Sequence, residues 1–276
     1  MESEWTVSRE EIVAALSWTW SRLAELGVSL GRDEWDLPTR CPGWTVRDVF
    51  SHMIGTESML AGRPHPTVDV PDLDHLRNDI GRFNEAWVIE RRDRAGQDVL
   101  AEFTIITGER LAALCSMSRD QFDEEAWTPA GMATYGRFMQ IRAFDCWMHE
   151  QDVRAALGRP GGLTGAAVRV AFAEMATALG FVVGKRAGAP EGSTVVLAIT
   201  TPEGRQRFDI VVDGRAKLVS QRVLSPTATV TADLETFAAL VGGRIDPAGP
   251  LADGRVKIAG DPDLAERVAT HLAFVI

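Results

Sequence analysis

Apolar residues recur at every third or fourth position along most of residues 8–185, which is the spacing that buries one face of an α-helix. A capping-box sequence, Ser8-Arg-Glu-Glu11, opens the first of these stretches. The pattern predicts six helices, over residues 8–26, 45–61, 76–92, 96–116, 133–157 and 165–185. Between them, turn-forming and polar residues predict loops over residues 27–43 and 62–75, and a polar crossover over residues 118–130 anchored by Trp127.

The residues after Arg186 have a different composition: stretches rich in β-branched residues are separated by predicted turns. Strands are predicted over residues 194–200, 208–212, 216–221, 227–232 and 256–258, and helices over residues 233–241 and 261–274. A chain of 276 residues exceeds what one hydrophobic core usually holds. The sequence therefore predicts two domains: a helical bundle over residues 1–186 and a small α+β domain over residues 187–276.

Three side chains on the predicted helices have the chemistry of a metal site. Asp145 and His149 are four residues apart, so they share one helix face at a spacing of about 5–6 Å. His52 lies on or beside the apolar stripe of another helix. A buried carboxylate is costly unless something positive meets it, and a divalent cation would do so. Two imidazoles and a carboxylate leave one tetrahedral position open, as in catalytic zinc sites, although these ligand types also suit nickel, iron or manganese.

The same residues also fit roles without a metal. A histidine on an apolar helix face is commonly a hydrogen-bonded core residue, and Asp145 and His149 by themselves would form an ordinary i,i+4 pair. Cys146 points about 100° away from its neighbours on the helix, so we expect it to be packed rather than nucleophilic. His65 and His75 fall in the predicted loop region and are expected to be solvated.

Charge and composition limit the partners. The net charge of −10 argues against a nucleic-acid backbone or an anionic membrane surface as the main partner. The acidic N-terminus lacks the features of a secretory signal, and no run of about 18 apolar residues predicts a membrane span. Three widely spaced cysteines fit no disulfide framework. We therefore expect a cytoplasmic monomer or homodimer without nucleic-acid or membrane partners.

Three stretches of the chain resemble one known family. Residues 39–53, TRCPGWTVRDVFSHM, look like the opening motif of the mycothiol-dependent maleylpyruvate isomerase family. Residues 142–158, RAFDCWMHEQDVRAALG, resemble its second motif, and residues 256–265 are similar to part of its C-terminal domain. The resemblance covers essentially the whole chain. It implies a DinB-like four-helix bundle followed by a small α+β sterol-carrier-like domain.

The resemblance also implies a ligand set and a co-substrate. The family holds a divalent metal on two histidines and one acidic residue, which match at His52, Asp145 and His149, and it uses mycothiol as the thiol. The acid is Asp here where the family's isomerase has Glu, which shortens the reach of this ligand by one methylene. The ligand types make zinc the first choice for this metal.

These inferences predict an enzyme in which a metal-bound thiolate attacks an electrophilic small molecule, as a cis-trans isomerase or a thiol S-transferase. Without a thiol, the same site would activate water for hydrolysis. Six further residues are candidates for supporting the metal ligands or for binding the substrate: Glu150, Asp152, Arg142, Arg154, Trp44 and Trp147.

A function of another class is also compatible with the sequence. The chain would then be a non-catalytic metal or thiol sensor, or a carrier that holds a lipid-like ligand in an apolar cavity of its C-terminal domain. The sequence alone does not decide between these functions, and it does not name the electrophile.

Overall fold

The computed structural model of the chain describes residues 5–275. Its backbone contacts form two compact units, residues 9–162 and residues 163–275 together with residues 5–8. The sequence-based division placed the boundary at residue 186, so the two divisions differ over the helix α7 (Ala166–Phe181). α7 belongs to the second unit because it packs against the strands β4 (Gly204–Asp213) and β5 (Arg215–Val219).

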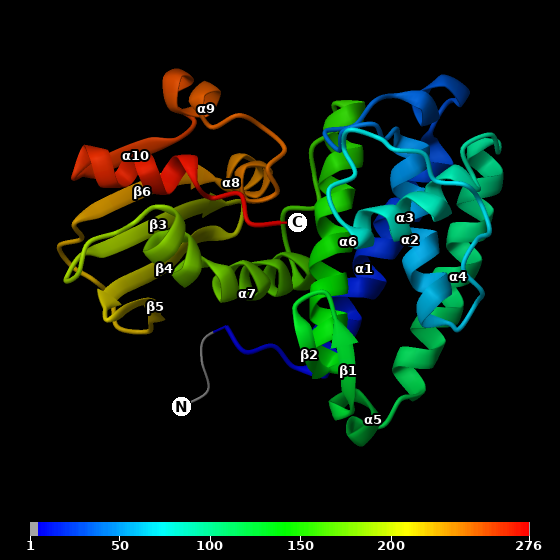
Figure 1. The fold of residues 1–276 in the computed structure, drawn as a ribbon, viewed down its shortest axis with the longest axis horizontal. Helices are drawn as coiled ribbons and strands as arrows, with labels where there is room; N and C mark the ends of the chain where they lie inside the picture. The colour runs from blue at the N-terminus through cyan, green and yellow to red at the C-terminus, as the bar shows by residue number, and fades with distance from the viewer. Residues whose placement is uncertain (1–4, 276) are drawn as a thin grey trace. The chain divides into compact units, whose positions relative to one another are not determined.

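The first unit contains four long helices that lie side by side (Figure 1). They are α1 (Arg9–Ser29), α2 (Val46–Leu60), α4 (Gly96–Ser116) and α6 (Tyr135–Leu157). Both α1 and α2 pack against α4 and α6. Thr45 and Thr134 cap the N-termini of α2 and α6, where their side chains accept hydrogen bonds from backbone N–H groups. The predicted four-helix bundle is confirmed.

Aromatic side chains connect the segment after α1 to the bundle core. The predicted loop of residues 27–43 contains a short 3-10 helix, η1 (Arg32–Asp36), in which Trp35 is only 2% exposed. The Trp35 ring lies 5.1 Å from that of Phe50, and Phe50 lies 5.1 Å from Phe103. Because aromatic pairs at this spacing add to the free energy of area burial, they anchor the segment that leads into α2.

The predicted polar crossover has regular structure. It contains α5 (Arg119–Asp123) and β1 (Glu125–Thr128), and β1 pairs with β2 (Gly131–Thr134). The prediction that Trp127 anchors this segment is wrong, since Trp127 is 55% exposed. Phe122 is the buried anchor, because it packs against Gly136 at the start of α6.

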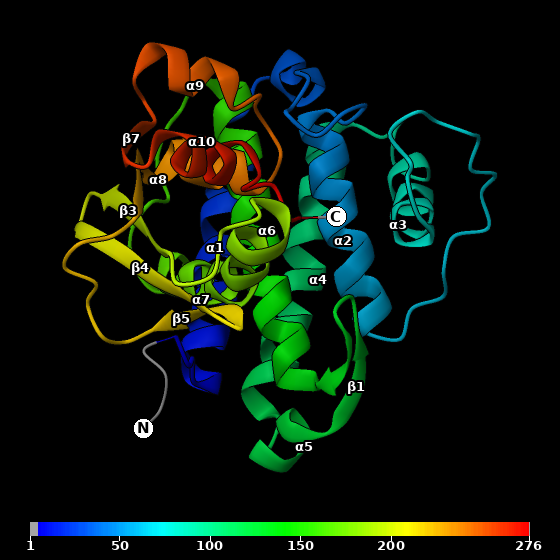
Figure 2. The same cartoon turned by 60° about the vertical axis from the view of Figure 1, so that its left-hand side comes forward.

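A long segment without helix or strand precedes α3 (Asp79–Ile89), which begins three residues later than predicted because Asn78 caps it. Figure 2 shows this segment (cyan) looping around the outside of α3. α3 packs on α2 at Gly55, where an added Cβ would lie 2.4 Å from the ring of Trp87. The absence of a side chain at Gly55 therefore determines how closely α3 approaches the bundle.

The second unit is a five-stranded sheet packed against helices. Its strand order is β5-β4-β3-β6-β7, with β3 (Thr194–Thr201), β6 (Ala228–Asp233) and β7 (Lys257–Gly260). Only the β3–β6 pair is parallel. Its further helical elements are η2 (Val182–Arg186), α8 (Leu234–Val241), α9 (Ala248–Asp253) and α10 (Pro262–Thr270).

One buried face of this sheet forms the core of the unit. Phe208 of β4 contacts Phe172 of α7 at 5.7 Å and Phe237 of α8 at 6.2 Å between ring centroids, so both helices cover the same face. α10 packs against β6 and β7. The predicted α+β class is confirmed, whereas α9 was not predicted.

One stretch of the described residues, Ala166–Arg186, is long and apolar enough to cross a membrane, with a mean hydropathy of 1.7. The sequence was expected to contain no such stretch, because Arg169 and Glu174 interrupt its run of apolar residues. Two thirds of its apolar window is buried inside the protein. That burial is typical of a core helix.

Two glycines of α4 provide a matched test of packing. A Cβ at Gly96 would lie 2.2 Å from the Trp35 ring, whereas a Cβ at Gly108 would meet nothing within 4 Å. We expect Gly96→Ala to lower the free energy of unfolding by roughly 1–3 kcal/mol, because the indole cannot move without disturbing the core. Gly108→Ala should raise it by about 0.5–1 kcal/mol through helix propensity. Urea denaturation measures both, and equal shifts would contradict the proposed packing.

Glu102 of α4 provides a test of charge. It accepts hydrogen bonds from Arg91 at 2.7 and 3.0 Å and from Arg94. Burial raises the pKa of Glu102, but the two guanidinium groups outweigh that effect and hold the pKa below its usual value. Because the folded-state pKa is below the unfolded-state value, the carboxylate stabilises the fold at neutral pH, and this contribution is lost as the pH falls through the folded-state pKa.

We therefore expect Glu102→Gln to lower the free energy of unfolding by about 1 kcal/mol at neutral pH. The difference from the wild-type protein should shrink as the pH is lowered from about 5 towards 3, where both chains carry a neutral side chain. Urea denaturation over this pH range measures it. A difference that stays constant with pH would contradict the role of the carboxylate charge.

Candidate functional site

α2 carries His52 on the buried side of the bundle. The helix begins at a capping box in which Thr45 and Asp48 hydrogen-bond reciprocally through side-chain and backbone groups. His52 follows one turn after Asp48 and is 5% exposed. Its neighbours Phe50 and Met53 are fully buried, so the imidazole is withdrawn from bulk solvent, as the apolar spacing predicted.

α6 brings the other two predicted ligands to His52. The Nε2 atom of His52 lies 3.4 Å from Oδ2 of Asp145, and Nε2 of His149 lies 3.6 Å from Oδ1 of the same carboxylate. The two imidazole rings lie 4.8 Å apart in an edge arrangement. His149 is 5% exposed, whereas the Asp145 side chain is 31% exposed. The structure therefore gathers the three residues around one point, with its accessible side at Asp145.

The protonation equilibria of these three groups are shifted by burial and by one another. Burial lowers the pKa of His52, and the neighbouring Asp145 only partly opposes it. Burial also disfavours the charged form of His149, but Asp145 and Asp152 outweigh this effect and raise the pKa of His149 to about 10. The Asp145 carboxyl loses hydration on burial, yet Arg142 and the two histidines hold its pKa well below the usual value. Asp145 is therefore a carboxylate at any physiological pH.

The donor set fits a divalent cation. Two ligands of a tetrahedral zinc ion, each at about 2.1 Å, lie about 3.4 Å apart, and the two Nε2–Oδ separations of 3.4 and 3.6 Å are close to this value. All three donor atoms lie within 4.8 Å of one another. The buried Nδ1 of His52 has no hydrogen-bond partner among residues 5–275, so this ring is oriented by its packing and by Asp145, and not by a second hydrogen bond.

Asp152 and Cys41 hold the opposite side of the His149 ring. The Nδ1 atom of His149 lies 3.1 Å from Oδ2 of Asp152, and the Cys41 thiol donates to the same oxygen at 3.1 Å. A carboxylate in this position fixes the tautomer and the orientation of a ligating imidazole, which is the arrangement expected for Asp152. Sequence reasoning missed Cys41, although it lies in the motif that precedes α2. These three residues also lie close enough to bind a metal, but they already satisfy one another by hydrogen bonds.

A buried ion network supports Asp145 from the other side. Arg142 donates to Asp145 Oδ2 and, at 3.0 and 3.1 Å, to Glu57 of α2. Arg110 donates to Glu57 at 3.1 Å and to the Tyr135 hydroxyl at 2.6 Å. Two buried guanidinium groups therefore share the Glu57 carboxylate. Arg142 is a neighbour of the site, as predicted, and its contacts place it behind Asp145.

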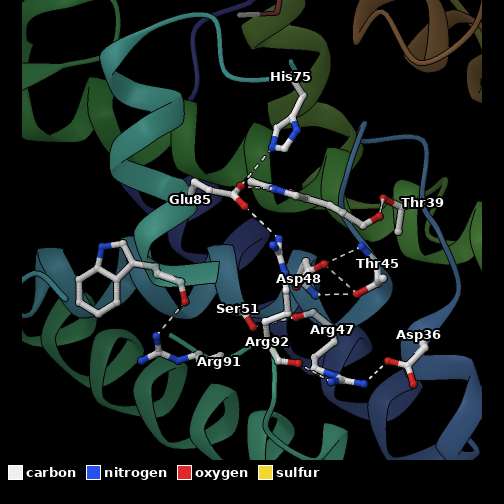
Figure 3. Close-up of polar contacts among 12 residues, drawn as sticks. Asp36, Thr39, Thr45, Arg47, Asp48, Ser51, His75, Glu85, Arg91 and Arg92 are labelled. Atoms are coloured by element: carbon white, nitrogen blue, oxygen red, sulfur yellow. Dashed lines mark hydrogen bonds and ion pairs between the residues drawn. The ribbon is translucent and has the colours of Figure 1, made fainter. Parts of the chain in front are cut away.

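Trp44 lies against both imidazoles. Its ring is centred 5.1 Å from that of His52 and 6.1 Å from that of His149. The indole N–H donates to Glu85 of α3 at 2.8 Å. His75 also contacts Glu85, at 3.2 Å, and its side chain is 18% exposed, so the prediction that His75 is solvated is wrong (Figure 3). Trp44 therefore packs against both candidate histidines, and its role as the wall of a substrate pocket stays a prediction.

Three of the predicted supporting residues make their contacts away from the candidate ligands: Glu150, Arg154 and Trp147. Glu150 is fully buried and binds Arg22 at 2.8 and 2.9 Å and Arg154 at 2.8 Å. Trp147 is fully buried and donates to the Gly162 carbonyl at 2.9 Å. The helical step of about 100° per residue explains this outcome, since Trp147 and Glu150 leave α6 on other sides than Asp145 and His149. Cys146 is packed as expected, and burial raises the pKa of its thiol to about 12.

Comparison with known proteins identifies relatives of both units. The model of the mycothiol maleylpyruvate isomerase N-terminal domain matches residues 16–154, and the model of the MDMPI C-terminal domain matches residues 169–267. The solved structure of a mycothiol-dependent maleylpyruvate isomerase is 16% identical, with a TM-score of 0.57 over 89% of this chain and 93% of that chain. No curated protein matches the chain.

Two further solved structures are similar. A histidine-to-alanine mutant of the same isomerase is 15% identical, with a TM-score of 0.56 over 89% of this chain and 93% of that chain. Sterol carrier protein 2 like 2 from Aedes aegypti is 24% identical, with a TM-score of 0.31 over 37% of this chain and 96% of that chain. At these identities, the likeness to the isomerase shows a shared fold.

The buried ion network yields a stability prediction that is independent of any metal. Glu57→Gln leaves Arg110 and Arg142 without their shared carboxylate, so we expect it to lower the free energy of unfolding by about 3 kcal/mol or more. Glu109→Gln removes an exposed carboxylate that pairs with Arg63, and its effect should be within about 0.5 kcal/mol of zero. Urea denaturation of the two variants compares them, and a small effect at Glu57 would show that the network is not a significant source of stability.

Proposed function

The chain belongs to the mycothiol maleylpyruvate isomerase family, and from this premise we propose that it is a metal-requiring enzyme that uses mycothiol to act on a small electrophile. Cis-trans isomerisation is the reaction that the family favours, and release of the thiol adduct, a transferase reaction, is its close alternative. The observation that carries the proposal is the convergence of His52, Asp145 and His149 on one point.

In this proposal His52, Asp145 and His149 hold a divalent cation, with zinc as the metal. When bound, the cation would lower the pKa of a coordinated thiol and so supply a nucleophilic thiolate near neutral pH, the species that thiol-dependent isomerisation or transfer requires. His52 is suited to ligation because burial favours its neutral form. Asp145, being ionised, supplies the negative charge that keeps a cation in a buried position.

The surrounding residues orient the ligands. Asp152 accepts the hydrogen bond from Nδ1 of His149 and so directs Nε2 towards Asp145. Arg142 holds the Asp145 carboxylate against the two imidazoles, which compensates for the shorter reach of Asp than of the family's Glu. Trp44 shields the imidazoles on one side and would keep water from competing with the thiol.

The charges around the site favour an anionic ligand. Arg110 and Arg142 balance Glu57 and Asp145, and Asp152 adds one further negative charge. A divalent cation with neutral histidines would leave the cluster with one net positive charge. A thiolate, or a substrate carboxylate, would neutralise it, and in a buried site such neutralisation is worth more than in water.

The C-terminal unit gives less support to a lipid carrier. One cavity of this unit, of about 300 Å³ among the described residues, is lined by Trp5 and Phe172 but also by Arg169, Glu203 and Gln206. A lipid-like ligand would require an apolar lining. A sensor, a carrier and a hydrolase are therefore alternative functions, and the experiment described next distinguishes them from the proposed enzyme. The proposed enzyme acts in the cytoplasm, as a monomer or homodimer, without nucleic-acid or membrane partners.

The test compares His52→Ala with His271→Ala, which removes an exposed histidine from the end of α10. Each protein is analysed for bound metal by elemental analysis and assayed with maleylpyruvate and a panel of other electrophiles, with and without mycothiol. We expect one metal per chain and thiol-dependent turnover in the wild type and in His271→Ala. His52→Ala should lose metal and at least about a hundredfold in rate, because even partners of the ligands contribute 10- to 100-fold.

Other results assign another function. A wild-type protein without stoichiometric metal overturns the proposed site. Metal without product or mycothiol adducts, checked by mass spectrometry, favours the sensor or carrier. Turnover that does not depend on added thiol favours the hydrolase.

A further inference from the structure

The position of Trp44 determines how much of the metal site is covered. Its ring lies 5.1 Å from the His52 ring at an interplanar angle of 35°, and 6.1 Å from the His149 ring at 37°. A rotation of this side chain about its χ angles would uncover both imidazoles. The residue that holds this rotamer therefore determines whether the indole covers the two imidazoles.

The loop before α2 fixes only the backbone of Trp44. Its carbonyl accepts hydrogen bonds from the backbone N–H and the hydroxyl of Thr39 at 2.9 and 2.8 Å, and its N–H donates to the carbonyl of Cys41 at 3.0 Å. Gly43 allows this turn through a φ of +79°. An added Cβ there would also meet the His75 ring at 2.7 Å. None of these contacts restrains the indole.

Glu85 restrains the indole. This α3 carboxylate is fully buried and accepts the Trp44 Nε1–H at 2.8 Å. Arg92 donates to its second oxygen at 2.9 Å, and His75 lies 3.2 Å from the first. Figure 3 shows Glu85 between His75 and Arg92, with the capping residues of α2 close by.

The network extends to the start of α2. Arg92 also reaches Asp48 at 3.4 Å, and Asp48 closes the capping box with Thr45. Asp48 lies one turn before His52 on the same helix. The carboxylate that holds Trp44 is thus tied, through Arg92, to the helix that carries His52. A charge-assisted hydrogen bond of this kind is about twice as strong as a neutral one.

We propose that Glu85 is a positioning residue of the candidate site: it holds the Trp44 indole against His52 and His149 and thereby shapes the pocket into which the thiol binds. This inference rests on the proposed function. Within residues 5–275, Glu85 pairs with Trp44, His75 and Arg92 and makes no hydrogen bond or ion pair with His52, His149 or Asp145, so its effect on the site passes through Trp44. It should alter thiol affinity and leave metal affinity unchanged.

The test is a double-mutant cycle of Glu85→Gln and Trp44→Phe in the full-length protein loaded with Co²⁺. Trp44→Phe keeps an aromatic ring but removes the indole N–H, and Glu85→Gln keeps the side-chain shape. Mycothiol binding is followed by the absorption band of a thiolate on Co²⁺. Glu102→Gln is the matched control, since it removes another carboxylate that pairs with arginines and makes no contact with Trp44.

We expect Glu85→Gln to weaken mycothiol binding about tenfold, the equivalent of a hydrogen bond to a charged group. In the Trp44→Phe background the same substitution should change it by less than about twofold, because the bond no longer exists. Co²⁺ stoichiometry and affinity should be unchanged in all variants, and Glu102→Gln should bind mycothiol as the wild type does. Equal effects of Glu85→Gln in both backgrounds, or a loss of Co²⁺ affinity, would overturn the proposal.

A second measurement needs neither metal nor thiol. Hydrogen exchange of the Trp44 indole N–H, identified by NMR as the signal missing in Trp44→Phe, should accelerate at least about tenfold in Glu85→Gln. Unchanged exchange overturns the role of Glu85 even if the enzyme is active. Accelerated exchange in a protein whose wild type shows no thiolate band would support the contact but overturn the proposed function, and with it the role in thiol binding.

Discussion

The burial of charge between α2 and α6 is the constraint on which the helical unit depends. Asp145 lies between two imidazoles on one side and the Arg142 guanidinium on the other. Withdrawing such groups from water costs several kcal/mol for each ion, so each of them must face an opposite charge or a hydrogen-bond donor. A shift of either helix by one turn would separate Asp145 of α6 from His52 of α2, and this contact helps to set the register in which the two helices meet.

The support around these residues has two kinds of chemistry. Behind Asp145, the shared carboxylate of Glu57 holds two arginines in a network that is fully buried. Behind His149, Asp152 and the Cys41 thiol make a smaller group that directs one ring nitrogen. The Glu57 network fixes the position of the Asp145 carboxylate, and the Asp152–Cys41 group fixes which ring nitrogen of His149 faces the site. Both would matter for the proposed metal, because the position of a ligand atom as well as its charge determines how well a cation binds.

The candidate acidic ligand is Asp145, whose side chain is one methylene shorter than that of a glutamate and carries the same charge. A shorter side chain brings the carboxylate closer to its own helix, where Arg142, three residues earlier on α6, can reach it. At 16% identity the fold of the solved isomerase is retained. In the proposed function, Trp44 and the charge balance of the two arginines are the features of this chain that would act on the choice of substrate.

The sequence by itself determined the long helices, the strands and the three candidate ligands, because periodicity and capping residues are local signals and His52, Asp145 and His149 belong to recognisable motifs. It could not reveal Cys41, Glu57 or Glu85. The contacts that tie them to the site join residues 41 to 111 positions apart along the chain: Cys41 with Asp152, Glu85 with Trp44 and Glu57 with Arg142. No local pattern distinguishes a carboxylate that will be buried from one that will be solvated. Only the tertiary structure decided these contacts. Helical spacing predicts which residues share one face of a helix, but it does not predict which face of another helix will pack against them.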